Sequence, residues 1–99
     1  MHARVSTYGG SPEQAEEGIR NFEGLTDALR GLEGFAGGYL LADRATGKAM
    51  SITLWSTADA AQASAEKAKQ MRSDAAGGAG MSVESGETYE VAVHIQPAT

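Results

Sequence analysis

The segment FAGGYLLADRATGKAMSITLW, residues 35–55, holds two β-strand patterns separated by a turn, and it decides the fold that we predict. Phe35 to Ala42 has the composition of a strand, and the Asp and Gly of stretch 43–48 are typical turn residues, so we expect a β-hairpin. Ala49 to Trp55 is the return strand. Its residues alternate between two faces, one with Met50, Ile52 and Leu54 and the other with Ser51, Thr53 and Trp55.

A helix is predicted on each side of this hairpin. Ser11-Pro12-Glu13-Gln14 is a strong helix start, because Ser is a good N-cap, Pro suits the first helical position and Gln completes a capping box. From there one apolar stripe at three- and four-residue steps predicts a single helix, formed by Ala15, Ile19, Phe22, Thr26, Leu29 and Leu32. Ser56 or Thr57 should cap the second helix, which we expect to end near Arg72 or Ala75.

The outer strands complete the pattern. His2 to Tyr8 alternates like a strand, and Glu87 to Gln96 is expected to be the last one. Ser73 to Gly86 is rich in Ala, Gly and Ser, which favours a mobile connection. The resulting order, β-α-β-β-α-β, is the ferredoxin-like α+β motif. It predicts one domain over residues 1–99, an antiparallel sheet in strand order 4-1-3-2, and both helices on one face of that sheet.

Composition narrows the classes of function. Ninety-nine residues suffice for one core, and the formal net charge of −5 argues against nucleic acid or an anionic membrane as partner. The absence of cysteine excludes disulfides, thiol nucleophiles and thiolate metal sites. The apolar runs are far shorter than the ~20 residues of a membrane helix, and the first residues lack the apolar segment of a signal peptide. We therefore expect a soluble, cytoplasmic protein.

The two faces of the predicted sheet indicate a partner. Helices cover one face, and the other face of a monomer should be polar at every second position. Neither parity is polar throughout, since Ile52 and Leu54 lie on one face and Trp55 on the other. The simplest solution is a homodimer in which two sheets pack face to face. The alternative is a monomer with one mixed, partly hydrated face.

These residues carry a resemblance to a known family. The run from Gly34 to Leu40 (GFAGGYL), the hairpin through 43–48 and the run from Ile52 to Ser56 (ITLWS) resemble the antibiotic-biosynthesis-monooxygenase-like family of the dimeric α+β-barrel superfamily. The resemblance implies a homodimeric barrel. It also implies oxygenation of a small aromatic or phenolic molecule without a bound cofactor or metal. That reaction needs a deprotonated substrate, an apolar pocket, a few hydrogen-bond donors and a base.

Two other readings of the same superfamily stay open. The first is a haem-binding protein; haem-degrading relatives combine an Asn on the first strand, the Trp that ends the third strand and a His on the second helix. Only the Trp is matched here, by Trp55, because residues 57–75 contain no His. The second is a non-catalytic dimeric module, for example in a stress response, whose cavity is filled by side chains. Whether the chain is an enzyme is thus not decided by its sequence.

The candidate binding residues lie around Trp55. If its strand face points to the helices, Trp55 and Thr53 overlook a stripe of small residues that includes Ser64 and Ala68 on the second helix. Such a stripe allows either close packing, with Trp55 in the core, or a pocket with Trp55 in its wall. Tyr39 could add a phenol to that pocket or lie in a dimer interface. Substrate-binding candidates are therefore Trp55, Tyr39, Thr53, Ser64 and Ala68.

Two residues are candidates for catalysis, His94 and Arg4. His2 and His94 lie at the ends of the first and last predicted strands, which should be neighbours, and a histidine near neutrality is a suitable general base. Surface or dimer-edge positions are the alternative for both. Arg4 lies in mid-strand, where we expect either a salt bridge to Glu90 or an anion clamp for a phenolate.

Overall fold

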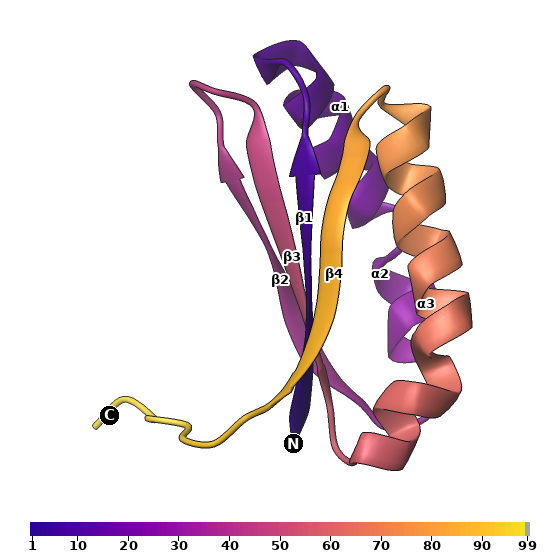
Figure 1. Ribbon diagram of the computed structural model, residues 1–99, viewed down its shortest axis with the longest axis vertical. Helices are drawn as coiled ribbons and strands as arrows, with labels where there is room; N and C mark the ends of the chain where they lie inside the picture. Colours follow the sequence, from indigo (N-terminus) through magenta and orange to yellow (C-terminus); the bar gives the residue numbers. More distant parts are fainter. Residues whose placement is uncertain (99) are drawn as a thin grey trace.

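The computed structural model describes residues 1–98 and arranges them as one sheet with helices on one of its faces (Figure 1). Its elements in chain order are β1 (His2–Gly9), α1 (Pro12–Glu23), α2 (Thr26–Arg30), β2 (Phe35–Asp43), β3 (Lys48–Trp55), α3 (Ala58–Gly78) and β4 (Ser82–Glu90). The strands pair antiparallel in the order β2-β3-β1-β4. This order is 4-1-3-2 counted from the opposite edge, so the predicted α+β class and ferredoxin-like topology are confirmed.

Local signals at the helix starts act as the sequence predicts. The Ser11 Oγ accepts a hydrogen bond from the Gln14 backbone N–H at 3.2 Å, and the Gln14 Oε1 accepts one from the Ser11 backbone N–H at 2.8 Å. At the start of α3 the cap is Thr57, whose Oγ1 accepts from the Ala60 backbone N–H at 3.0 Å. Both caps satisfy N–H groups that have no partner within the helix.

The single helix predicted before the hairpin is wrong. The chain forms α1 and α2 instead, and the break falls at Gly24, which is the C-cap residue of α1. The Gly24 backbone N–H donates the last hydrogen bond of this helix, to the Arg20 carbonyl at 3.2 Å. Glycine is a poor residue for a helix interior, which favours an end at this position. The apolar spacing continues across the break, so periodicity alone could not reveal it. The turn lets Leu29 of α2 pack in the same cluster as Trp55.

The boundary between α3 and β4 also differs from the prediction. Residues 73–86 form no mobile connection: α3 continues to Gly78, and β4 begins at Ser82. The physical reason is packing, because Ala75 and Ala76 are buried and the Asn21 side chain of α1 donates to the Ala75 carbonyl at 3.0 Å. The strand predicted over 87–96 is therefore displaced toward the N-terminus, and residues 91–98 lie outside any strand.

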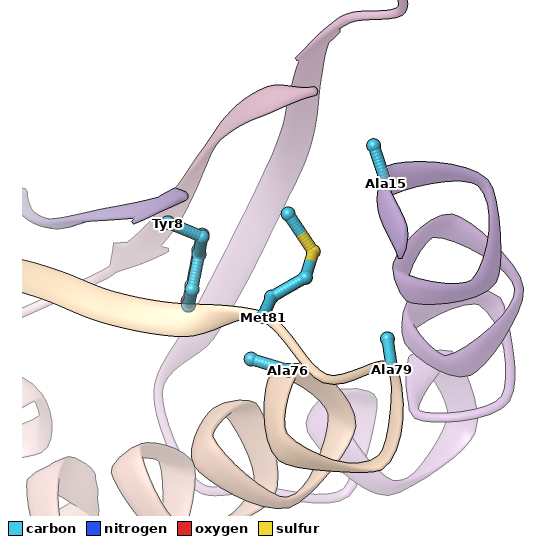
Figure 2. Close-up of a cluster of buried hydrophobic side chains, with 5 residues drawn as sticks. All are labelled: Tyr8, Ala15, Ala76, Ala79 and Met81. Atoms are coloured by element: carbon cyan, nitrogen blue, oxygen red, sulfur yellow. The ribbon is translucent and has the colours of Figure 1, made fainter. Parts of the chain in front are cut away.

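Two buried clusters hold the helices on the sheet. The first lies near the start of α1 and the end of α3, where Met81 extends between Tyr8 of β1 and Ala15 of α1 (Figure 2). Its buried members are Tyr8, Ala15, Ala76, Ala79 and Met81. The second is centred on Trp55 at the opposite end, with Leu29, Ala61 and Ala68. The small alanines of α3 allow this helix to approach the sheet closely in both clusters.

The register of the strands gives the two faces of the sheet opposite characters. Residues directly opposite one another share a face. The helix-covered face therefore contains Arg4, Ser6 and Tyr8 of β1 opposite Thr53, Ser51 and Ala49 of β3, with Trp55 opposite His2. The open face contains Ala3, Val5 and Thr7 opposite Leu54, Ile52 and Met50, continued on β2 by Tyr39 and Leu41. Hydroxyl groups thus lie under the helices, and aliphatic groups lie on the open side.

Candidate functional site

A cavity of about 610 Å³ lies between the β2–β3 half of the sheet and helices α1 and α2. Its volume is in the range of small-molecule sites, which are usually a few hundred cubic ångströms. Most of its wall is apolar. The lining residues are Ile19, Phe22, Glu23, Thr26, Leu29, Arg30, Phe35, Gly37, Gly38, Tyr39, Leu40, Ala42, Arg44, Ser51 and Thr53.

Small residues on the sheet create this space. Gly38 lies opposite Thr53 on the helix-covered face and has no side chain to project from this position into the cavity. A Cβ at Gly38 would also approach the Ile52 carbonyl oxygen to 2.7 Å, so the glycine allows β2 and β3 to pack closely here. Next to it, Ser51 and Thr53 are the floor residues of β3, and both are short and buried. The break between α1 and α2 sets the opposite wall, with Phe22 before it and Leu29 after it. Small residues on β3 and the break between α1 and α2 therefore leave an open space between the sheet and the helices.

The polar groups of the floor are held in fixed positions. The Ser51 Oγ and the Tyr8 hydroxyl form a buried hydrogen bond of 2.8 Å. The Thr53 Oγ1 accepts a hydrogen bond from the Trp55 indole N–H at 3.2 Å. Each of these hydroxyls keeps further hydrogen-bonding capacity, since a hydroxyl has one donor and two acceptor sites. They could therefore orient an oxygen of a bound molecule.

Charged groups of the cavity lie on exposed parts of the chain. Arg44 pairs with Glu16, and Arg30 pairs with Asp27 at 3.1 Å. Glu23 is the one carboxylate among the described lining residues, and it is exposed. No histidine lines the described cavity, and residues 1–98 contain no group of three or more side chains suited to hold a metal ion.

The predicted binding residues separate into two groups. Thr53 and Tyr39 line the cavity, although Tyr39 lies opposite Ile52 and is 64% exposed on the open side. Trp55, Ser64 and Ala68 do not belong to the described lining. Trp55 is 1% exposed and packs among the residues of the second cluster, which corresponds to the core alternative. It reaches the cavity wall indirectly, through an edge-to-face contact with Phe35 at 5.5 Å.

β1 and β4 are antiparallel neighbours, as predicted, but His94 does not lie on β4. His2 lies opposite Glu90, the last residue of β4, and His94 follows beyond the end of that strand. The error follows from the displaced strand, because every partner of β1 shifts with it. Arg4 likewise lies opposite Thr88, to which its Nη1 donates at 3.2 Å, and the expected salt bridge to Glu90 is not formed within residues 1–98.

Sequence reasoning missed two features of the helix-covered face. The first is the apolar wall of the cavity, in particular Phe22, Phe35 and Leu40. Phe22 entered the sequence analysis only as a member of the apolar stripe of the first helix. The Gly37-Gly38 pair was the available signal, because adjacent glycines in a strand mark a place where side chains are absent. The second is Arg72, a buried cation within α3. Its position in an otherwise small-residue stripe was the signal for it.

Comparisons with known proteins support the fold. No protein-family profile matches the chain. A "putative antibiotic biosynthesis monooxygenase" from Deinococcus radiodurans has a similar structure, with a TM-score of 0.75, 18% identity and complete coverage of both chains. SnoaB, a cofactor-independent oxygenase from Streptomyces nogalater, follows with a TM-score of 0.63, 20% identity, and coverage of 97% of this chain and 96% of SnoaB. At these identities the likeness shows the fold, and it agrees with the family resemblance in the sequence.

The curated relatives are longer proteins. Two uncharacterized proteins of Mycobacterium tuberculosis, one in each of two strains, are 33% identical to this chain over 73 residues. The match covers 73% of this chain and 33% of each relative, so the chain spans about one third of their length. Within residues 1–98, none of the helices combines the length and apolar character needed to cross a membrane.

Proposed function

We propose that the cavity between β2–β3 and α1–α2 binds a flat aromatic or phenolic molecule, and that the protein oxygenates this molecule without a bound cofactor. The observation that carries the proposal is the cavity itself, about 610 Å³ with mostly apolar walls and two hydroxyl groups, Ser51 and Thr53, on its floor. A structural neighbour, SnoaB, is a cofactor-independent oxygenase and supports the reaction class.

The chemistry would depend mainly on the substrate. An electron-rich phenol or anthrone, once deprotonated, can pass an electron to molecular oxygen directly, which gives a substrate radical and superoxide. These two would combine into a peroxide at the ring carbon, and loss of water from this peroxide would leave one oxygen atom as the carbonyl of a quinone. The protein supplies binding, orientation and a dry environment. Phe22, Leu29 and Phe35 would exclude water from the ring faces. The Ser51 and Thr53 hydroxyls would hold the substrate oxygen by hydrogen bonds, which stabilise a phenolate. The proton would pass to a base in solution before the ring enters the apolar part of the cavity, or to Glu23, the one carboxylate among the described lining residues.

A homodimer is part of the proposal. The open face of the sheet places Val5, Ile52 and Leu54 side by side across β1 and β3, and Tyr39 and Leu41 on β2 are 64% and 48% exposed. An aliphatic sheet face of this kind marks an interaction surface. A second copy of the chain is the simplest partner. In a symmetric dimer the same apolar face of each chain packs against the other, so one interface covers both faces.

Ligand binding and oxygen consumption are tested separately. Thermal-shift measurements with a panel of anthrones, hydroquinones and flat phenols should show stabilisation by some members, and an oxygen electrode should then show uptake with these members. Leu40→Trp, which places a large side chain in the cavity, should abolish both signals. Gln62→Trp, at an exposed position of α3, is the matched control and should retain both.

The outcomes discriminate between the readings of the fold. Stabilisation without oxygen uptake would leave a binding module and refute the oxygenase. No stabilisation by any aromatic molecule would refute the proposed site as a whole. Equal loss in Leu40→Trp and Gln62→Trp would show that the effect comes from the added tryptophan and not from the filled cavity.

A further inference from the structure

A second cavity, of about 220 Å³, lies on the other half of the helix-covered face, between β1, β4 and α3. Three cationic side chains line it, Arg4 from β1 and Lys69 and Arg72 from α3, against one carboxylate, that of Glu84. This excess of positive charge occurs in a chain whose formal net charge is −5. We propose that this cavity is a binding site for a small oxyanion, such as phosphate or the carboxylate of a small organic acid.

Arg72 is the residue on which the proposal rests. Its side chain belongs to a residue only 3% exposed, and its Nη1 is buried without a hydrogen-bond partner within residues 1–98. No carboxylate of these residues lies within salt-bridge distance of it. An unpaired buried cation is costly, so proteins rarely keep one without a counter-charge. An oxyanion in the adjoining cavity would supply the missing acceptor.

Arg4 adds a second donor on the opposite wall of the cavity. Its Nη1 donates to Thr88, and its Nε is buried without a partner within residues 1–98. Gly86 on β4 makes room for this guanidinium, because a Cβ at Gly86 would lie 3.1 Å from the Arg4 Nη2 and 3.3 Å from the Ser6 Oγ. Two guanidinium groups and a buried hydroxyl thus border one small space. Arginine is well suited to such a site, because its planar group binds carboxylate and phosphate oxygens in pairs.

The electrostatics of the two arginines agree with an anionic ligand. Burial lowers the pKa of Arg72, the nearby Tyr8 hydroxyl opposes this change, and the positive charge of Arg4 lowers the pKa further. Arginine nevertheless stays protonated at neutral pH. The two like charges repel each other across the cavity, and an anion between them would remove that repulsion. The Glu84 carboxylate lies beside Gly9, because a Cβ at Gly9 would collide with the Glu84 Oε1. Glu84 forms no salt bridge with Arg4 or Arg72.

The test is a titration of the 99-residue chain with inorganic phosphate at constant ionic strength, followed by isothermal calorimetry and thermal shift. Sodium chloride provides the non-specific arm, and acetate and sulfate distinguish a carboxylate from a tetrahedral oxyanion. We expect saturable binding of phosphate, sulfate or acetate, and none of chloride. Arg72→Met should weaken that binding at least tenfold, and Arg4→Met should weaken it several-fold. Arg20→Met, which removes an exposed cation of α1 that lines neither cavity, is the matched control and should bind like the wild type.

Glu84→Gln separates an anion site from a merely structural arginine. Removing this carboxylate from the lining should tighten phosphate binding several-fold, whereas a structural role of Arg72 predicts no change. Glu84→Gln and Arg4→Met keep the proposal testable if Arg72→Met does not fold. A response to phosphate equal to that of chloride, or equal binding by wild type, Arg4→Met and Glu84→Gln, would overturn the proposal.

Discussion

The two faces of the sheet are an instructive pair, because they reverse the usual distribution of polar and apolar groups. The helix-covered face contains Ser6, Ser51 and Thr53, all nearly inaccessible to solvent. The open face contains Val5, Ile52 and Leu54, all only partly buried. Buried hydroxyl groups are stable under helices when they form hydrogen bonds or line a cavity. A contiguous aliphatic surface on an open face is typical of a site where another surface packs. This contrast is the basis on which we propose small-molecule binding under the helices and association of two chains through the open face.

The largest expected effect on the helix-covered face comes from Trp55→Ala. Trp55 is 1% exposed and joins β3, α2 and α3 in one cluster, so the variant would leave a large cavity. We expect a loss of about 3–5 kcal/mol in the free energy of unfolding, measured by urea denaturation at a fixed protein concentration. Val93→Ala, in the exposed residues after β4, should change it by less than about 0.5 kcal/mol. A small effect of Trp55→Ala would mean that Trp55 borders an open pocket and not a filled core.

On the open face the decisive variant is Ile52→Lys. Ile52 lies between Val5 and Tyr39 in the centre of this face, and an ammonium group there would be desolvated in a face-to-face dimer. We expect wild-type protein to scatter light with twice the 10.2 kDa mass of one chain, and Ile52→Lys with the mass of one chain. The dimer affinity of the variant should be weaker by at least about a hundredfold. Gln62→Lys on α3 should leave the mass unchanged. A wild-type chain that scatters as a single copy at micromolar concentration would refute the dimer.

The contrast between the faces was partly predictable from the sequence. Alternation in β3 placed Trp55, Thr53 and Ser51 together, and the structure puts that set under the helices. The helix starts at Ser11 and Thr57 were also predictable, because a cap is a local interaction between neighbouring residues. The hairpin and the order of the strands followed from such local signals and from general rules of connection.

The sequence could not give the features that depend on tertiary packing. Ala75 and Ala76 belong to a stretch with the composition of a linker, yet both are buried and the helix continues to Gly78. Ala76 packs in one cluster with Ala15 of α1, and Asn21 of α1 donates to the Ala75 carbonyl, so these contacts stabilise the helix here. The start of β4 shifts as a consequence, which moves the partners of His2 and Arg4. A pocket beside Trp55 was one of two alternatives that the sequence left open. The cavity lies elsewhere, because its position depends on the break at Gly24, which the continuous apolar spacing conceals.

A smaller effect distinguishes the hydroxyl pairs of the two faces. Tyr8 and Ser51 form a buried hydrogen bond on the covered side, whereas Thr7 and Ser85 form an exposed one. Tyr8→Phe should cost about 1–3 kcal/mol, because it leaves the buried Ser51 hydroxyl without this partner. Thr7→Val should cost less than about 0.5 kcal/mol. Denaturation of Tyr8→Phe, Ser51→Ala and the double variant would give a coupling free energy of about 1 kcal/mol, and a coupling near zero would contradict the described geometry.

The smallest expected effect is a titration on the open face. The Tyr89 hydroxyl donates to the Glu87 carboxylate on the same strand, and this hydrogen bond, together with the negative charge of Glu87, raises the pKa of Tyr89 above its ordinary value of 10.0. Folding thus favours the neutral phenol. The resulting contribution to stability is complete below the pKa of the unfolded chain and is lost as the pH rises through the higher pKa of the folded chain.

Ultraviolet titration of the phenolate, with Tyr89→Phe to assign the signal, should show this raised midpoint. Glu87→Gln should return the midpoint toward the ordinary value, and a midpoint that ignores this substitution would exclude the hydrogen bond as the cause. The same measurement also reports on the partner surface, because Tyr89 and Glu87 lie opposite Ala3 and Val5 of the open face. Covering that face by a second copy adds desolvation, which disfavours the phenolate further. The Tyr89 midpoint should therefore be higher in the wild-type dimer than in Ile52→Lys, and equal midpoints would place Tyr89 outside the area that the second copy covers.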